Sequence, residues 1–258
     1  KIAPLFKKTI RVGTVHCPGI NIRNYTNLDK IFSISQAVAD DLEARQGIIS
    51  EVILNGIDFD DINSNPKPYT NGDTLRIVQT GRLDCSIKGQ DIMTEAVAIQ
   101  TKKGRSVSVD FIGEPYDKQT IDELSARLGV SDRIHVLGRK SREYIYKNLC
   151  AYHLGAMPSR YEGFGLTLIE SMAAKIPVVA TNVDGPAEIL MDNRYGLLCK
   201  PEDPEDLARA IASVMDNYKQ FSANAKGAAY DYARDNFSID ATAAHYIQEY
   251  HRLLNRDN

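Results

Sequence analysis

The stretch PSRYEGFGLTLIESMAAKIPVVAT, from Pro158 to Thr181, decides the fold of this chain. It follows an apolar run, passes through a glycine-rich turn, continues as a predicted helix from about Leu166, and ends in an apolar strand at residues 178–181. Short apolar strands joined by a helix are typical of a parallel sheet with helices packed on it. The stretch therefore predicts an α/β fold with a doubly wound parallel sheet.

The same alternation continues on both sides of this stretch. A polar, proline-bearing linker at residues 60–73 separates two regions, and we place the domain boundary near residue 65. After it we predict strands at residues 76–80, 107–113, 134–137 and 151–157, and helices at 91–102, 118–128, 142–148, 186–191, 204–216 and, as two helices, 223–254. Before it we predict strands at residues 10–15, 30–34 and 52–54 and a helix at 36–45 that Gly47 ends.

Composition narrows the classes of function. Of the 258 residues, 43% are hydrophobic and 25% are charged, as in ordinary globular domains. The net charge of -3 and the pI near 6.0 give no reason to expect a nucleic-acid partner. Without an apolar run near 20 residues or a signal-peptide layout, we expect a cytoplasmic protein, with the inner face of the membrane as the alternative. We expect reduced thiols at Cys17, Cys85, Cys150 and Cys199.

Two glutamates bracket the glycine-rich turn of the deciding stretch. Glu162 precedes the turn and Glu170 lies about one turn into the helix, which places the carboxylates on the order of 10 Å apart. Gly163 and Gly165 allow backbone amides to approach a ligand closely, and the helix start presents unpaired N–H groups. The turn could hold a diphosphate, with one carboxylate at each end of a nucleotide sugar.

A second motif, TGRLDCSIKG at residues 80–89, follows the first strand of the larger domain. Open parallel sheets place their ligands beyond the carboxyl ends of such strands. Arg82 can form a bidentate fork to phosphate, and Lys88 supplies a compact positive charge. Together they would offset the negative charge on a departing nucleoside diphosphate.

These two motifs resemble the signatures of glycosyltransferase family 4, the retaining enzymes with the GT-B fold. The resemblance continues in TVHCPG around His16, in residues 31–43 and in residues 53–58, so it covers nearly the whole chain. It implies that Glu162 contacts the donor sugar, Glu170 the ribose, and Arg82 and Lys88 the diphosphate, with His16 facing the sugar. The further binding residues implied are Gly81, Gly138, Arg139, Gly163, Phe164, Gly165 and Leu166.

The family's reaction moves a sugar from a nucleoside diphosphate, such as a UDP-sugar or GDP-sugar, to an acceptor hydroxyl. The acceptor could be a glycan, a glycolipid, a protein or a small molecule, and no cofactor or metal is expected, since no Asp-x-Asp motif is placed to hold one. The alternative is a non-catalytic nucleotide-sugar-binding module. An NAD-dependent oxidoreductase is disfavoured because the chain lacks a G-x-G-x-x-G turn after a strand.

The resemblance also implies a domain arrangement. Residues 1–65 would be a partial acceptor-side domain with the linker, residues 66–236 the Rossmann-like nucleotide-sugar domain, and residues 237–258 a helix that crosses back to the first domain. The chain begins at Lys1 rather than at methionine, so we expect a fragment that binds nucleotide but does not transfer sugar by itself.

Two positions depart from the family pattern. Lys175 and Asp184 stand where glycine is frequent. The glycine replaced by Lys175 would end the helix in a left-handed conformation, which costs other residues roughly 1 kcal/mol or more. The departure at Lys175 therefore predicts a small loss of stability and no loss of a catalytic group.

Overall fold

The computed structural model describes residues 9–23 and 25–255. The chain divides into two compact units. The smaller unit consists of Lys1–Ile57 and Asp235–Asn258, and the larger unit is Asp58–Arg234. In the described part of the chain, no helix combines the length and apolar character needed to cross a membrane.

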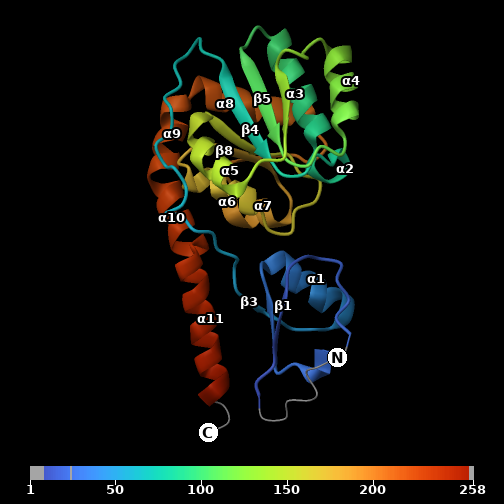
Figure 1. Ribbon diagram of the computed structural model, residues 1–258, viewed down its shortest axis with the longest axis vertical. Helices are drawn as coiled ribbons and strands as arrows, with labels where there is room; N and C mark the ends of the chain where they lie inside the picture. Colours follow the sequence, from blue (N-terminus) through green and yellow to red (C-terminus); the bar gives the residue numbers. More distant parts are fainter. Residues whose placement is uncertain (1–8, 24, 256–258) are drawn as a thin grey trace. The chain divides into compact units, whose positions relative to one another are not determined.

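The larger unit is built on a parallel sheet (Figure 1), and its strand order is β6-β5-β4-β7-β8-β9. Its strands are β4 (Leu75–Thr80), β5 (Val107–Ile112), β6 (Ile134–Gly138), β7 (Leu154–Met157), β8 (Val178–Thr181) and β9 (Leu197–Cys199). The chain builds outward from β4 to β6 and then returns to add β7 on the other side of β4. The order reverses between β4 and β7, which is where doubly wound sheets bind ligands.

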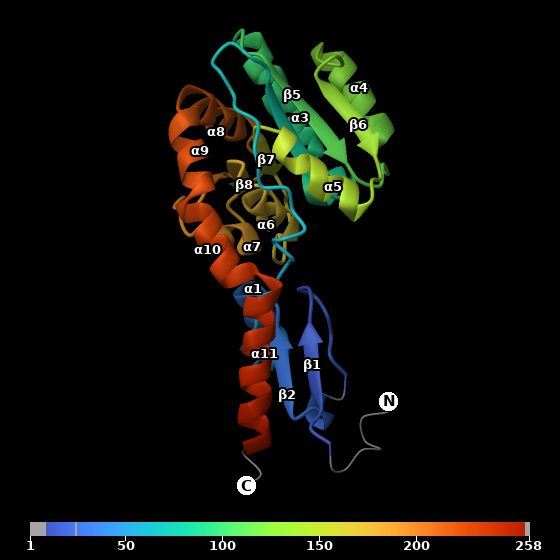
Figure 2. The same ribbon diagram turned by 60° about the vertical axis from the view of Figure 1, so that its left-hand side comes forward.

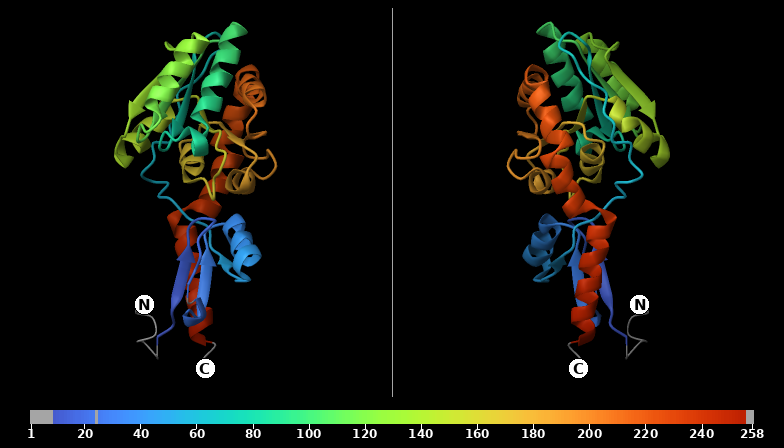
Figure 3. Two further views of the ribbon diagram at one scale, coloured as in Figure 1. Left: turned by 90° about the vertical axis from the view of Figure 1, so that its right-hand side faces the viewer. Right: turned by 90° about the vertical axis from the view of Figure 1, so that its left-hand side faces the viewer.

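Helices cover both faces of this sheet (Figure 3). The helices of the unit are α2 (Cys85–Lys88), α3 (Gln90–Lys102), α4 (Lys118–Leu128), α5 (Arg142–Asn148), α6 (Leu166–Ala173), α7 (Asp184–Leu190), α8 (Pro204–Asp216) and α9 (Tyr218–Lys226), and the unit ends within α10 (Ala228–Phe237). Parallel crossovers are right-handed, so reversing the strand order moves the connecting helices to the opposite face. Accordingly α3 packs with α4 and α8, whereas α6 packs on β7 and β8.

Strand burial and helix capping account for the core of the larger unit. Every residue of β5 is buried, as expected for a central parallel strand covered on both faces. Helix α8 begins as predicted, because the Asp203 side chain accepts a hydrogen bond of 2.8 Å from the Asp206 amide and Pro204 occupies the first turn. Its apolar face is buried at Leu207, Ile211, Val214 and Met215.

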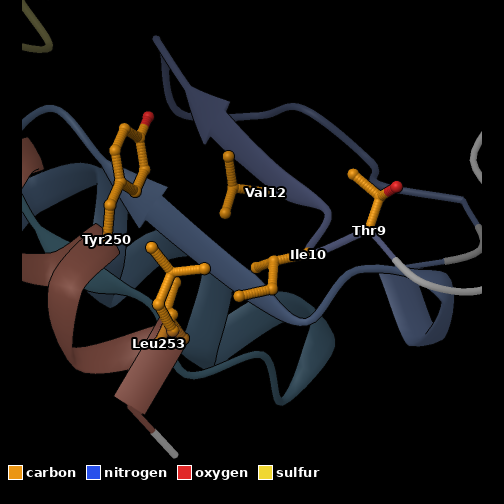
Figure 4. Close-up of a pocket in the computed structure, with 6 residues that line it drawn as sticks. Thr9, Ile10, Val12, Tyr250 and Leu253 are labelled. Carbon is orange, nitrogen blue, oxygen red and sulfur yellow. The ribbon is translucent and has the colours of Figure 1, made fainter. Parts of the chain in front are cut away.

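The smaller unit contains a parallel sheet with the order β1-β2-β3, and Figure 2 shows β1 and β2 side by side. Its elements are β1 (Val12–Val15), a short 3-10 turn (Tyr25–Asn27), β2 (Lys30–Ser33), α1 (Gln36–Gln46), β3 (Glu51–Val52) and α11 (Ile239–Leu254). Helix α11 packs on this sheet through Tyr246, whose ring lies 5.3 Å from that of Phe32. An apolar pocket of the unit is lined by β1 and α11 residues with Thr9 and Ile10 (Figure 4).

The unit division differs from the boundary expected near residue 65. It falls between Ile57 and Asp58, because the linker packs on the larger unit instead of crossing solvent. Phe59 and Ile62 are buried, and the Lys67 amide donates a hydrogen bond of 2.9 Å to the Cys150 carbonyl. The second division falls after Arg234 rather than after residue 236.

The structure corrects some predicted elements. The segment expected to form two helices over 223–254 belongs to α9, α10 and α11, which break at Gly227 and at Ser238. Ser238 starts α11 by accepting a hydrogen bond from the Ala241 amide. The short elements β9 and α2 were missed, because such short segments carry too little periodicity to be detected. The cysteines are unpaired, as expected, with Cys17 exposed and Cys85, Cys150 and Cys199 buried.

Lys175 takes the left-handed conformation expected of it, with φ at 60°. Its ammonium lies 4.1 Å from the centre of the Tyr230 ring, a cation–π contact worth about 0.5–1 kcal/mol at such sites. This contact offsets part of the backbone cost.

We therefore expect Lys175→Gly to be nearly neutral in unfolding free energy, since it removes both the backbone cost and the ring contact. Lys175→Ala keeps the cost and loses the contact, so it should be less stable than the glycine variant by about 1 kcal/mol. Urea denaturation of the variants measures the difference. Equal stabilities would contradict the assignment of strain to this position.

Candidate functional site

The two predicted motifs lie at the same edge of the sheet. Residues 80–89 follow β4 and residues 158–165 follow β7, and these strands pair in parallel with Ile77 opposite Leu154. Parallel neighbours end at the same edge, so both loops leave the sheet where its strand order reverses. The structure thus brings together segments that are far apart in the sequence.

Lys88 and Glu162 meet at this edge. The Lys88 Nζ atom donates to Glu162 Oε2 at 2.6 Å, and the side chains are only 23% and 16% exposed. Lys88 is the last residue of the short helix α2, and Glu162 lies in the turn between β7 and α6. A partly desolvated pair of opposite charges is more strongly coupled than one on the open surface.

Glycine lets the two loops approach each other. Gly89 has φ at 67°, and a Cβ atom there would lie 2.0 Å from the carbonyl oxygen of Pro158. The Arg160 amide donates to the Ile87 carbonyl at 2.8 Å, and the Gln79 side chain donates to the Lys88 carbonyl at 2.7 Å. A larger residue at position 89 would push the Lys88 turn away from the Glu162 turn.

A second close approach of two backbone segments fixes the start of the motif at residues 80–89. Gly81 has φ at 135°, and a Cβ atom on Gly113, just after β5, would lie 1.8 Å from the Gly81 carbonyl oxygen. The Gln90 side chain donates to the Arg82 carbonyl at 3.0 Å. The Arg82 side chain itself is 52% exposed, with its Nε atom 3.6 Å from Asp84. Its guanidinium therefore remains accessible to an anion.

The glycine-rich turn ends at the start of α6. Gly165 has φ at 120° and precedes the first helical residue, Leu166, which is exposed, whereas Phe164 is buried. A Cβ atom on Gly185 of α7 would lie 2.1 Å from the Phe164 carbonyl oxygen, and the Gly185 amide donates to the Glu162 carbonyl at 3.1 Å. The turn between Glu162 and Leu166, which includes Gly163, is thus supported from α7.

Glu170 lies in α6 against α5. Burial raises the pKa of its carboxyl to about 7, although a hydrogen bond with the Tyr146 hydroxyl and the positive charge of Arg142 act to lower it. Tyr146 is buried, and the Arg142 guanidinium stacks 4.7 Å from the centre of its ring. The carboxyl of Glu170 consequently changes charge near neutral pH.

The other predicted residues lie further along the chain. Gly138 ends β6 with φ at 68°, and its carbonyl accepts a hydrogen bond of 3.1 Å from the amide of Gly113, the residue that packs against Gly81. Arg139, the next residue, is exposed. His16 follows β1 in the smaller unit and is exposed, so its proposed contact with the sugar stays a prediction.

Sequence reasoning overlooked the residues that support the site. Gln79, Gln90, Gly113 and Arg160 hold the loops together through the contacts described above, but none binds the expected ligand in the family resemblance. Arg160 lies inside the deciding stretch, but its partner Ile87 lies in the other motif, so its position in the sequence alone did not reveal the contact. In residues 9–23 and 25–255, no group of three or more His, Cys, Asp or Glu side chains is placed to hold a metal ion.

Known proteins share this fold. A glycosyltransferase from Rickettsia africae ESF-5 has a TM-score of 0.83 and 22% identity over 98% of this chain and 79% of its own. Anabaena Alr3699/HepE, solved in complex with UDP, has a TM-score of 0.83 and 20% identity over 97% of this chain and 74% of its own. These likenesses confirm the predicted α/β class of the GT-B type.

Relatives are also found by sequence. The glycosyltransferase MJ1178 of Methanocaldococcus jannaschii is 30% identical over 192 residues, which are 74% of this chain and 51% of that protein. The chain spans about half or less of the relatives that it matches, at 51%, 36% and 42% of their lengths. The profile of the family described as Glycosyl transferases group 1 matches residues 61–231. Because this match covers most of the 258 residues, the chain belongs to the glycosyl transferases of group 1.

Proposed function

We propose that this chain forms the donor-binding part of a retaining glycosyltransferase of family 4, which moves a sugar from a nucleoside diphosphate to an acceptor hydroxyl. The observation that carries the proposal is the 2.6 Å contact between Lys88 and Glu162 where the strand order reverses. It places a cation suited to the diphosphate beside a carboxylate suited to sugar hydroxyls. The UDP in the Anabaena structure makes UDP the first nucleotide to test.

The reaction breaks the bond between the anomeric carbon and the diphosphate oxygen and forms one to the acceptor oxygen. Negative charge grows on the departing diphosphate, and Lys88, Arg82 and the amides at the start of α6 would stabilise it. Fixed charges and dipoles aimed at developing charge are usually the largest contribution to such catalysis. Glu162 would hold the sugar by its hydroxyls, and no protein nucleophile is needed.

Release of the nucleoside diphosphate tests the proposal. The protein is screened with UDP-, GDP- and ADP-sugars by thermal shift, in which the stabilisation follows RT ln(1 + [L]/Kd), and then assayed for nucleotide release with candidate acceptors. Binding followed by release supports the transferase. Binding without release with any acceptor favours the alternative of a non-catalytic binding module.

Nucleotide affinity should depend on pH through Glu170. The ionised carboxylate accepts hydrogen bonds from both ribose hydroxyls, whereas the protonated form loses acceptor capacity. Because its pKa is raised to about 7, we expect affinity to fall as the pH drops from 8 towards 5.5, by up to about tenfold per pH unit.

Calorimetric titration at several pH values measures this dependence. The Glu170→Gln variant is the control, because the nucleotide phosphates titrate identically with both proteins. The variant should bind more weakly than the parent at pH 8 and show a flatter profile. A parent profile as flat as that of the variant would exclude Glu170 from the ribose site.

We also propose that Arg82 and Lys88 replace a divalent metal at the diphosphate. Transfer should then survive EDTA with less than about a twofold change in rate. Two cations within one loop can offset the charge of the leaving group without a metal bridge. Loss of activity in EDTA that manganese restores would assign the diphosphate mainly to a metal.

A further inference from the structure

Arg160 makes a dense set of contacts beside the proposed diphosphate site. Its guanidinium forms a fork to Asp91, with Nη1 at 2.8 Å from Oδ1 and Nη2 at 2.9 Å from Oδ2. Nη1 also donates to the Cys85 carbonyl, and Nε donates to Glu202 Oε1 at 2.5 Å. Arg160 therefore connects the loop after β7 with α2, with the first turn of α3 and with the loop before α8.

These contacts leave Arg160 poorly placed to bind a ligand directly. Four of the five N–H groups of an arginine side chain are engaged by Asp91, Cys85 and Glu202. The side chain is 20% exposed, in contrast to the 52% of Arg82. Its two carboxylate partners already balance its charge. Its geometry thus fits a structural support for neighbouring groups better than a phosphate ligand.

Helix α2 is the element that needs tertiary contacts. This helix is only four residues long, and a single helical turn is unstable without tertiary contacts. Lys88 is its last residue, so the position of the ammonium depends on how the turn is held. Arg160 binds the first residue of α2 by its side chain, through the Cys85 carbonyl, and the third by its backbone amide, through the Ile87 carbonyl.

Further contacts hold α2 and the Arg160 side chain in place. The Asp117 side chain accepts a hydrogen bond of 2.7 Å from the Cys85 amide at the start of α2. Glu202 has φ at 59°, a conformation that non-glycine residues rarely adopt, and its carboxylate is the partner of Arg160 Nε. Arg160 also stands two positions before Glu162 in the same loop. Arg160 thus joins α2 directly to the loop that carries Glu162, and the neighbouring Tyr161 amide adds a hydrogen bond of 3.3 Å to the Ile87 carbonyl.

We propose that Arg160 is a positioning residue that holds the turn bearing Lys88 in register with Glu162, and so builds the diphosphate site without touching the ligand. The inference rests on the proposed function, because it concerns the same site. The proposal predicts different effects on the diphosphate and on the nucleoside. Disturbing Arg160 should weaken interactions with the diphosphate and leave the contacts of the nucleoside, which involve Glu170 on α6, unchanged.

Two variants test this inference. Arg160→Lys keeps the charge but cannot form the fork, and Asp91→Asn removes the charge from the other side of it. The probes are UDP, GDP and ADP and their nucleosides, of which the pair that binds the parent most tightly is used. Both variants should raise the Kd of the nucleoside diphosphate roughly tenfold or more, and leave that of the nucleoside within about twofold.

A matched control exists in the same unit. Arg105 forms an equivalent fork to Asp216, at 2.6 and 2.9 Å, away from both motifs. Arg105→Lys should change neither Kd by more than about twofold. If Arg160→Lys and Asp91→Asn weaken the nucleoside and its diphosphate equally, or weaken neither, the positioning role is excluded.

Hydrogen exchange gives a readout that needs no ligand. The Lys88 amide donates to the carbonyl of Asp84, which precedes α2, and the Gly89 amide donates to that of Cys85, its first residue. Their exchange should accelerate about tenfold or more in Arg160→Lys, while that of α4 stays as in the parent. Unchanged exchange in α2 would overturn the inference. Accelerated exchange in Arg160→Lys, together with a parent that binds none of the nucleotides, would uphold the support of α2 and reject the proposed function instead.

Discussion

Replacing Lys88 with methionine should lower the rate of nucleoside diphosphate release by about 10²–10³-fold and weaken nucleoside diphosphate binding by roughly tenfold or more. The substitution removes the ammonium, keeps most of the side-chain volume and leaves the 16% exposed Glu162 carboxylate without its 2.6 Å partner. That carboxylate would then repel the charge that grows on the leaving group. Both binding and turnover are lowered, because the diphosphate is charged before and during the reaction.

Steady-state kinetics and calorimetry on the parent and the variant measure the two effects. Lys103→Met is the control, since Lys103 is 55% exposed and lies 3.9 Å from Glu205, far along α3 from the motif loop. It should behave as the parent. If Lys88→Met binds the diphosphate as tightly as the parent does, Lys88 is not part of the diphosphate site.

Replacing Glu162 with glutamine should lower turnover without weakening the binding of the nucleoside diphosphate. We expect turnover to fall by about 10²-fold or more, because a charged contact to the sugar hydroxyls is lost as the sugar acquires positive charge. Affinity for the nucleoside diphosphate should be unchanged or tighter, because Lys88 loses the carboxylate that competes for its ammonium. The two variants together distinguish a sugar contact from a phosphate contact within one ion pair.

The matched control is Glu205→Gln, a change of the same kind at an exposed residue of α8. Turnover and binding are compared for the parent, both single variants and the Lys88→Met/Glu162→Gln double variant. The double variant should bind the diphosphate better than Lys88→Met, because the unpaired carboxylate is gone. An undiminished turnover number in Glu162→Gln would refute the sugar-contacting role.

Much of the fold could be predicted because its signals are local. The helices Lys118–Leu128, Arg142–Asn148 and Pro204–Asp216 and the strand Val178–Thr181 have the bounds expected from the sequence. Caps and apolar spacing act within a few residues, so they are readable in one segment. The division between the units lies between Ile57 and Asp58 rather than near residue 65, and Phe59 and Ile62, just after it, are buried.

The candidate site was predictable only in its parts. The glutamates, the cations and the glycine-rich turn could be identified, because each lies in a short motif at the end of a predicted strand. The pairing of Lys88 with Glu162 could not, since it joins residues separated by 74 positions. The raised pKa of Glu170 was equally hidden, because it arises from burial against α5.

The sequence by itself determined the alternation of strands and helices and the motifs at the strand ends, because these depend on backbone preferences and spacing over a few residues; the left-handed residue at Lys175 was expected only from the family pattern. Only the tertiary structure decided which loops touch. Gly89 and Gly185 are needed because Pro158 and Phe164 lie against them, and the Arg160 guanidinium contacts α2, α3 and the loop before α8. Close packing creates these requirements, and close packing exists only after the sheet has assembled.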